Sequence, residues 1–364
     1  MATKKTGISR DLIIHPGETI GDVLAEREIT QAELASRTGV SRAYISSIIS
    51  GKRNISAKFA MALEYALDVP KSFWLNLQAN YDAELLEAHQ LESITDEERD
   101  VRKQLDKIVK LLREQGCMAR GESIEASIIS LRRILKISSL TNLNKTTLGG
   151  AFRIADSKKV NPYVLGAWIR ICQELGGQQN VECGFDVSRT NSLIEDLKDI
   201  MINHEDEIQN RLTKTLNAYG IEFLLMKNVP GAPVQGYITR NDAGVYRLYL
   251  TLRQKFADIF WFSLFHEIGH IVNGDLQKNM NFLDDGADEN CEKAADTFAS
   301  NALLEESSFQ SFIQKGNFSI TAILEYAESQ NVQPYIVIGR LQRNEKYLKY
   351  NQYAEYKTRY EWVE

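Results

Sequence analysis

The sequence predicts a mainly α-helical protein, with an all-α N-terminal domain and an α+β C-terminal domain that contains a small antiparallel sheet. Short helix-compatible segments separated by glycines and prolines fill residues 15–70. Alternating strand patterns gather between residues 221 and 252. The 364 residues, 43% of them hydrophobic, are enough for two or three domains. We expect domains at residues 1–80 and 191–364, with a helical linker or middle region at residues 81–190.

The charge is uneven along the chain. The net charge is −6, but residues 1–60 contain nine Lys and Arg against six Asp and Glu, so this segment carries +3 and the remainder −9. The chain as a whole is therefore not a basic nucleic-acid binder. A mildly basic head on an acidic body suits DNA contact at one end.

The N-terminus lacks the apolar core of a signal peptide, and no segment reaches membrane-spanning length. The cysteines form no C-x-x-C pair, so free thiols are the simplest interpretation. We expect a cytoplasmic protein with no membrane partner. The four cysteines are Cys117, Cys172, Cys183 and Cys291.

Capping residues mark two short helices near the N-terminus. Thr30 can cap a helix over residues 31–38, and Glu33 stands at the position that completes a capping box. Gly39 can adopt the left-handed conformation of a tight turn. Ser41 can then cap the next helix, which ends before Gly51.

This stretch reads T-Q-x-E-L-A-x-x-x-G-V-S-x-x-x-I-S-x-I-x-x-G-x-R and resembles the helix-turn-helix of phage-repressor-like regulators. Over roughly residues 12–90 the chain is similar to HigA-type antitoxins. The resemblance implies that the helix over residues 41–50 enters the major groove of operator DNA. Gln31, Lys52 and Arg53 would contact phosphates. The residues expected nearest the base edges are Ser41, Arg42, Ala43, Tyr44, Ser46 and Ser47.

Small side chains on this helix make few of the bidentate contacts that discriminate bases strongly. We therefore expect a homodimer on a repeated double-stranded site. The alternative is a helix-turn-helix that contacts only protein.

The region at residues 81–190 contains no catalytic arrangement of residues. Val101, Leu105, Ile108 and Leu112 recur at four-three-four spacing, which is compatible with a short dimer seam. The pattern covers less than two heptads, so an ordinary helix packed on the body of the protein is the simpler interpretation.

Strand patterns precede the most informative motif. Residues 221–226, 237–240 and 245–252 are expected to be strands, and residues 241–244 form a good hairpin loop between the last two. A helix over residues 253–272 follows, and apolar residues cover most of its circumference, so it should be buried.

This helix carries the motif H-E-x-x-H at residues 266–270. His266 and His270 are four residues apart, so both can bind one metal ion from the same face of the helix. Glu267 can accept a proton from the attacking water. The alternative is a pair of core histidines satisfied by hydrogen bonds.

None of the five histidines follows the motif, so the third ligand cannot be a downstream histidine. Residues 292–296 read E-x-x-x-D, and together with H-E-x-x-H this resembles the gluzincin metallopeptidases. The resemblance implies that Glu292 is the third Zn²⁺ ligand and that Asp296 orients a ligand histidine. Glu289 competes for the ligand position.

Over residues 195–345 the chain is similar to the ImmA/IrrE metallopeptidases. The sheet before the H-E-x-x-H helix, the Glu292 helix and a later segment at residues 336–342 carry this resemblance. Asp296 stands where the family has Asn, and it can still accept a hydrogen bond from a histidine. The resemblance implies zinc-dependent cleavage of a regulatory protein. Arg340 and Tyr335 are candidates for stabilising the oxyanion only because they are polar and lie in the matching segment.

Three hypotheses for the function follow. The first is a DNA-binding regulator with its own zinc endopeptidase, which cleaves itself or a partner regulatory protein. The second is an antitoxin-like repressor whose peptidase-like domain is catalytically silent and binds a toxin or a signal. The third is a protease whose helix-turn-helix recruits substrate proteins that carry similar domains.

Overall fold

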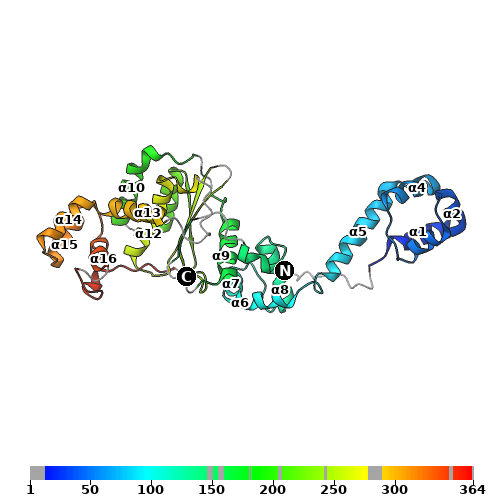
Figure 1. Ribbon diagram of the computed structural model, residues 1–364, viewed down its shortest axis with the longest axis horizontal. Coiled ribbons are helices and arrows are strands. Elements are labelled where there is room, and N and C mark those ends of the chain that lie inside the picture. Colours follow the sequence, from blue (N-terminus) through cyan, green and yellow to red (C-terminus); the bar gives the residue numbers. More distant parts are fainter. Residues whose placement is uncertain are drawn as a thin grey trace. The chain divides into compact units, whose positions relative to one another are not determined.

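The computed structural model describes residues 13–145, 151–154, 160–179, 181, 183–203, 207–241, 244–277, 289–343 and 347–362. Its chain divides into two compact units, with the boundary between Thr95 and Asp96 (Figure 1). Each unit has its own hydrophobic core. Among the described residues, no helix is both long and apolar enough to cross a membrane.

The first unit consists of five helices around a small core. They are α1 (Pro16–Glu26), α2 (Gln31–Thr38), α3 (Arg42–Ile49), α4 (Ala57–Leu67) and α5 (Lys71–His89). Leu34 and Ala35 of α2 pack with Ile45 and Ile48 of α3 and with Trp74 of α5. The two short helices predicted from their capping residues are confirmed.

The caps that the sequence indicates are present. The hydroxyl of Thr30 accepts a hydrogen bond from the amide of Glu33 at 3.1 Å, and that of Ser41 accepts one from the amide of Tyr44 at 3.2 Å. Gly39 ends α2 with φ +71°, in the left-handed region where glycine is favoured. These three residues set the turn between α2 and α3.

The second unit begins with helices that pack on one another. They are α6 (Asp96–Gln104), α7 (Asp106–Glu114), α8 (Ile124–Ile134), the 3-10 helix η2 (Leu140–Lys145) and α9 (Pro162–Leu175). The apolar residues of the candidate dimer seam, Val101, Leu105, Ile108 and Leu112, are all buried within this unit. The structure therefore supports the simpler interpretation, an ordinary packed surface.

The rest of the second unit is a sheet with helices around it. The helices are α10 (Thr190–Ile202), α11 (Ile208–Ala218), α12 (Ala257–Val272), α13 (Glu289–Leu303), α14 (Glu306–Lys315), α15 (Ile320–Ser329) and α16 (Pro334–Gln342). The predicted helix over residues 253–272 thus begins four residues later. The tail closes on its start, because the amide of Ala257 donates to the carbonyl of Thr358 at 3.0 Å.

The sheet has four strands in the order β1-β3-β4-β2. These are β1 (Ala151–Ile154), β2 (Ile221–Met226), β3 (Val234–Arg240) and β4 (Tyr246–Thr251). The predicted hairpin of β3 and β4 is antiparallel, but its loop residues 242–243 lie outside the described part of the chain. The expectation of a wholly antiparallel sheet is wrong, because β2 pairs parallel to β4. β1, which the sequence did not predict, adds a fourth strand at the edge.

Helices cover both faces of this sheet (Figure 1). Leu248 and Leu250 of β4 share a core with α12 on one face. On the other face, the rings of Trp168 of α9 and Tyr237 of β3 lie 6.1 Å apart. The sheet therefore buries the helix that carries H-E-x-x-H, with β3 directly against it.

Candidate metal centre and DNA-binding surface

Helix α12 places three polar side chains in the core. His266, Glu267 and His270 are at most 1% exposed. An unpaired polar group at such a depth destabilises the fold by roughly several kcal/mol, so these groups require partners.

A close helix crossing brings the partner residues near. A Cβ atom on Gly269 of α12 would lie 3.1 Å from Cα and 3.2 Å from the carbonyl oxygen of Ala295 on α13. These separations are tighter than ordinary contacts, so Gly269 eases the close approach of the two helices. This approach sets Glu292, one turn before Ala295, against the two histidines of α12.

The three predicted ligands converge. The Nε2 atoms of His266 and His270 are 3.1 Å apart, and the carboxylate oxygens of Glu292 lie 3.3 Å from the first and 3.5 Å from the second. All three ligand atoms fall within 4.8 Å of one another. Glu289, the competing acid, is 85% exposed and pairs with Lys293 on the surface. Glu292 therefore lies with the two histidines, and Glu289 does not.

Two carboxylates orient the histidines. Nδ1 of His266 lies 2.9 Å from Oδ1 of Asp296, and Nδ1 of His270 lies 2.8 Å from Oδ2 of Asp275. Because an ionised carboxylate only accepts, each Nδ1 carries a hydrogen, which leaves each Nε2 as the nitrogen that can bind a metal ion once it is deprotonated. Asp275 is a residue that the sequence analysis missed. Its only signal is an acid in the turn directly after the helix.

The charges of the cluster favour a cation. Burial lowers the pKa of His270, but the carboxylates of Glu292, Glu267 and Asp275 outweigh it and raise that pKa to about 9. Burial raises the pKa of Glu292, but hydrogen bonds and charge from the two histidines lower it to about 2. Two imidazole nitrogens and one carboxylate that face one another fit a divalent metal ion, and the set matches catalytic zinc sites that keep a fourth position open.

Glu267 is held against the sheet. Its side chain is fully buried, and a Cβ atom on Gly236 of β3 would lie 2.2 Å from its Oε1 atom. Gly236 therefore provides the space that the Glu267 carboxylate occupies. The sequence analysis did not identify this glycine, because nothing local marks it.

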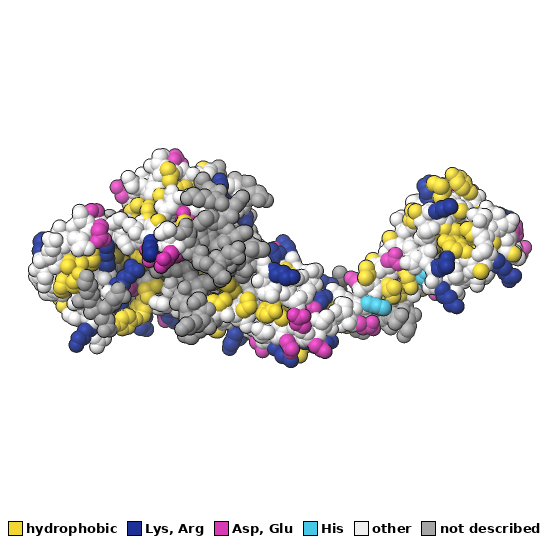
Figure 2. Space-filling model, viewed as in Figure 1, with side chains coloured by type: hydrophobic (Ala, Val, Ile, Leu, Met, Phe, Trp, Pro, Cys, Tyr) yellow, Lys and Arg dark blue, Asp and Glu magenta, His cyan; other side chains and the backbone are white. Residues whose placement is uncertain are grey.

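The outer face of α3 is open to solvent. Arg42, Ala43 and Ser46 are exposed, as are the neighbouring Ser41, Lys52 and Arg53, whereas Gln31 is half-buried. On the face drawn in Figure 2, lysines and arginines of this unit are spread as separate groups. A modest, dispersed positive charge fits the small net charge of residues 1–60.

Two of the candidate DNA contacts also have partners inside the unit. The hydroxyl of Ser47 donates to the carbonyl of Tyr44 at 2.7 Å. The ring of Tyr44 packs edge-on against Phe59, with centroids 5.3 Å apart, and the guanidinium carbon of Arg53 lies 5.4 Å from the centroid of the Tyr44 ring. Both residues are half-buried, so their contribution to a DNA surface is smaller than that of Arg42.

Known families match both ends of the chain. Residues 20–74 match the helix-turn-helix family model, and residues 247–332 match the model of the IrrE N-terminal-like domain, a peptidase family. The chain combines a helix-turn-helix domain with an IrrE-like domain. The second match contains both α12 and α13 of the candidate metal centre.

Three individual relatives each match less than a quarter of the chain. Virulence-associated protein A′ of Dichelobacter nodosus is 46% identical over 69 residues, which are 19% of this chain and 60% of the relative. An antidote protein of a plasmid maintenance system from Nostoc punctiforme is 40% identical and covers 22% of this chain and 88% of its own, with a TM-score of 0.21. Pseudomonas aeruginosa antitoxin HigA with the higBA promoter is 35% identical, and the match covers 23% of this chain and 97% of the antitoxin chain, with a TM-score of 0.21. The domain assignment therefore rests on the family models.

Arg340 and Tyr335, the two candidates for stabilising the oxyanion, make contacts within the fold. Arg340 of α16 donates to the carbonyls of Ser300 and Leu304 and pairs with Glu306. Tyr335 is 2% exposed and lies in the core. A different arginine is near the centre, because Arg343 lies 3.5 Å from Oδ2 of Asp296.

Proposed function

We propose that this protein is a DNA-binding transcriptional regulator whose C-terminal domain is a zinc-dependent endopeptidase that cleaves itself or a partner regulatory protein. One observation carries this proposal. Three ligand side chains converge from two helices, with Glu267 buried beside them. In this assignment residues 1–80 bind DNA and residues 191–364 form the peptidase.

The residues of the centre have separate tasks. His266, His270 and Glu292 would hold the zinc ion, and Asp296 and Asp275 would keep the imidazole rings oriented. When bound, zinc acts as a Lewis acid toward a peptide carbonyl and the attacking water. Glu267 accepts a proton from that water and delivers it to the leaving amine. Its burial next to β3 excludes bulk water from the carboxylate.

The N-terminal unit would bind operator DNA through α3. Arg42 and Ser46 face outward on this helix, and the exposed Lys52 and Arg53 follow it, so the last two would contact phosphates while the first two approach base edges. The few bidentate side chains favour a homodimer on a repeated site. Cleavage of the regulator or its partner would then release the operator.

Metal content tests the proposal directly. Zinc per chain is measured by mass spectrometry after dialysis for wild type, Glu292→Ala and Glu289→Ala. We expect one zinc per chain in the wild type and in Glu289→Ala, the matched control on the same helix, and none in Glu292→Ala. Glu267→Gln should retain zinc and lose peptide cleavage.

Absence of zinc from the wild type, even after zinc is added, would refute the proposal of a zinc peptidase. The alternative hypothesis, an antitoxin-like repressor with a silent domain that binds a toxin or a signal, would then replace it.

A further inference from the structure

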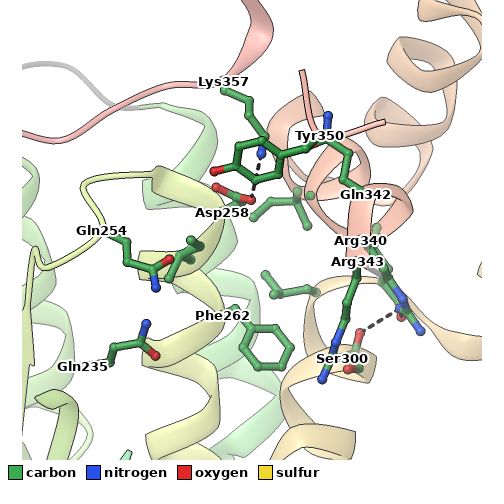
Figure 3. Close-up of a pocket in the computed structure, with 15 residues that line it drawn as sticks. Gln235, Gln254, Asp258, Phe262, Ser300, Arg340, Gln342, Arg343, Tyr350 and Lys357 are labelled. Carbon is green, nitrogen blue, oxygen red and sulfur yellow. Dashed lines mark hydrogen bonds and ion pairs between the residues drawn. The ribbon is translucent and has the colours of Figure 1, made fainter. Parts of the chain in front are cut away.

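A cavity of about 360 Å³ lies beside the candidate metal centre (Figure 3). It is lined by residues of β3, α12, α13, α16 and the C-terminal tail. Its apolar lining residues are Ile259, Phe262, Leu303, Leu304 and Ile336. We call it the Phe262 cavity.

The Phe262 cavity lies close to the candidate metal centre. Phe262 is one turn before His266 on α12, and the two rings are 6.5 Å apart. The guanidinium of Arg343 lies 5.6 Å from the centroid of Phe262 and 3.5 Å from Asp296, which orients His266. A peptide at the metal centre therefore has this cavity next to it.

The charged groups around the Phe262 cavity are already paired. Arg340 uses its donors on Glu306 and on the carbonyls of Ser300 and Leu304. Lys357 lies 3.8 Å from Asp258, and both side chains are largely buried. A charged ligand group would have to compete with these pairs, so the cavity favours a neutral, apolar occupant.

One buried side-chain amide of the cavity wall makes no hydrogen bond within the described part of the chain. Gln235 of β3 is only 8% exposed, and its amide has no hydrogen-bond partner among the described residues. Figure 3 shows this side chain directed into the space beside Phe262.

A β-bulge puts Gln235 there. Arg153 pairs with Gly236 and Ile154 with Val234, so Gln235 is the extra residue of β3. Strict alternation would place Gln235 and Gly236 on opposite faces of the sheet. Instead both approach α12, Gly236 at Glu267 and Gln235 in the cavity. Bulges next to active sites re-aim side chains in this way.

We propose that the Phe262 cavity is the pocket for a large apolar side chain of the peptide substrate, and that Gln235 hydrogen-bonds the substrate backbone as the chain enters. This inference rests on the proposed peptidase and adds its substrate class. The residue next to the scissile bond would be of the Leu, Ile, Met or Phe type, because burial of such a side chain in the cavity supplies binding energy. The bulge of β3 thus places Gln235, the substrate contact, next to Gly236, which makes room for the catalytic Glu267.

Binding of two peptide mimics to the zinc-loaded full chain tests the proposal without turnover. Both are succinyl hydroxamates of an alanine amide. One carries an isobutyl group next to the hydroxamate, and the other carries a hydrogen. Calorimetry gives the dissociation constant of each. We expect the isobutyl mimic to bind about tenfold more tightly, which corresponds to burial of one aliphatic side chain.

Two variants separate the parts of the proposal. Ser300→Phe places a ring in the cavity and should abolish the preference for isobutyl, whereas Asn301→Phe, the same change at an exposed neighbour outside the cavity, should preserve it. Gln235→Leu removes one hydrogen bond and should weaken both mimics by the same factor, about fivefold. We expect Gln235→Leu to leave the preference for isobutyl unchanged, because it alters only the contact with the substrate backbone.

The outcomes are distinguishable. If neither mimic binds the zinc-loaded wild type, the proposed peptidase site is wrong. If both bind equally, or if the isobutyl preference survives in Ser300→Phe, the metal site stands and the Phe262 cavity is not the side-chain pocket.

Discussion

Gly236→Ala should disable the peptidase through a single methyl group. The added Cβ would lie 2.2 Å from Oε1 and 2.7 Å from Cδ of Glu267, whereas ordinary contacts begin at 3.4 Å. The carboxylate would have to move by about 1.2 Å, the difference between the two separations. A misplacement of about 1 Å at a reacting group lowers the rate by roughly 100-fold. The overpacked core would also lose about 1–3 kcal/mol of stability.

The assay combines three measurements on the same preparations. Zinc content should stay at one per chain, because no ligand atom is displaced directly. The melting temperature reports the loss of stability, and mass-spectrometric mapping of cleavage in a denatured protein mixture reports activity. Gly184→Ala is the matched control, since nothing lies within 4 Å of a Cβ atom at that position. Wild-type cleavage by Gly236→Ala would refute the claim that Gly236 positions Glu267.

Three further predictions follow from other contacts. Asp275→Asn should weaken zinc binding 10- to 100-fold, measured by competition with a chelator, because His270 loses the carboxylate that orients its ring. Glu98→Gln should lower the free energy of unfolding by about 3 kcal/mol, measured with urea, because it leaves the largely buried Arg132 without its ion-pair partner. Arg42→Ala combined with Ser46→Ala should reduce affinity at least about tenfold for DNA fragments selected by the wild type, measured by anisotropy.

Controls sharpen these predictions. Burial raises the pKa of Glu98, but hydrogen bonds from Arg132 and the Leu140 amide outweigh it and hold that pKa below its usual value. Its contribution is therefore present above the unfolded-state pKa and disappears as the pH falls through the folded-state pKa. The difference in stability between wild type and Glu98→Gln should shrink on acidification, and a difference independent of pH would contradict this account.

Lys58→Ala, exposed on α4, is the control for DNA binding. If the wild type selects no DNA, that result would support the third hypothesis, in which the helix-turn-helix recruits substrate proteins to a protease.

The local parts of this protein were predictable from the sequence. Thr30, Ser41 and Gly39 act on residues two to four positions away, so their caps and turn follow from chemistry that the sequence displays. The same holds for His266 and His270, because a spacing of four on a helix sets both on one face. Glu292 and Asp296 share a face for the same reason, and the structure brings both to His266.

Tertiary structure alone decided the rest, because it depends on contacts between segments far apart in the chain. The parallel pairing of β2 with β4 requires a crossover that no local pattern specifies. The crossing of Gly269 on Ala295 selects Glu292 over Glu289, although both are acids at the start of one helix. Gly236 and Gln235 acquire their positions from a bulge against β1, and their roles are defined by space around Glu267 and Phe262 rather than by any motif.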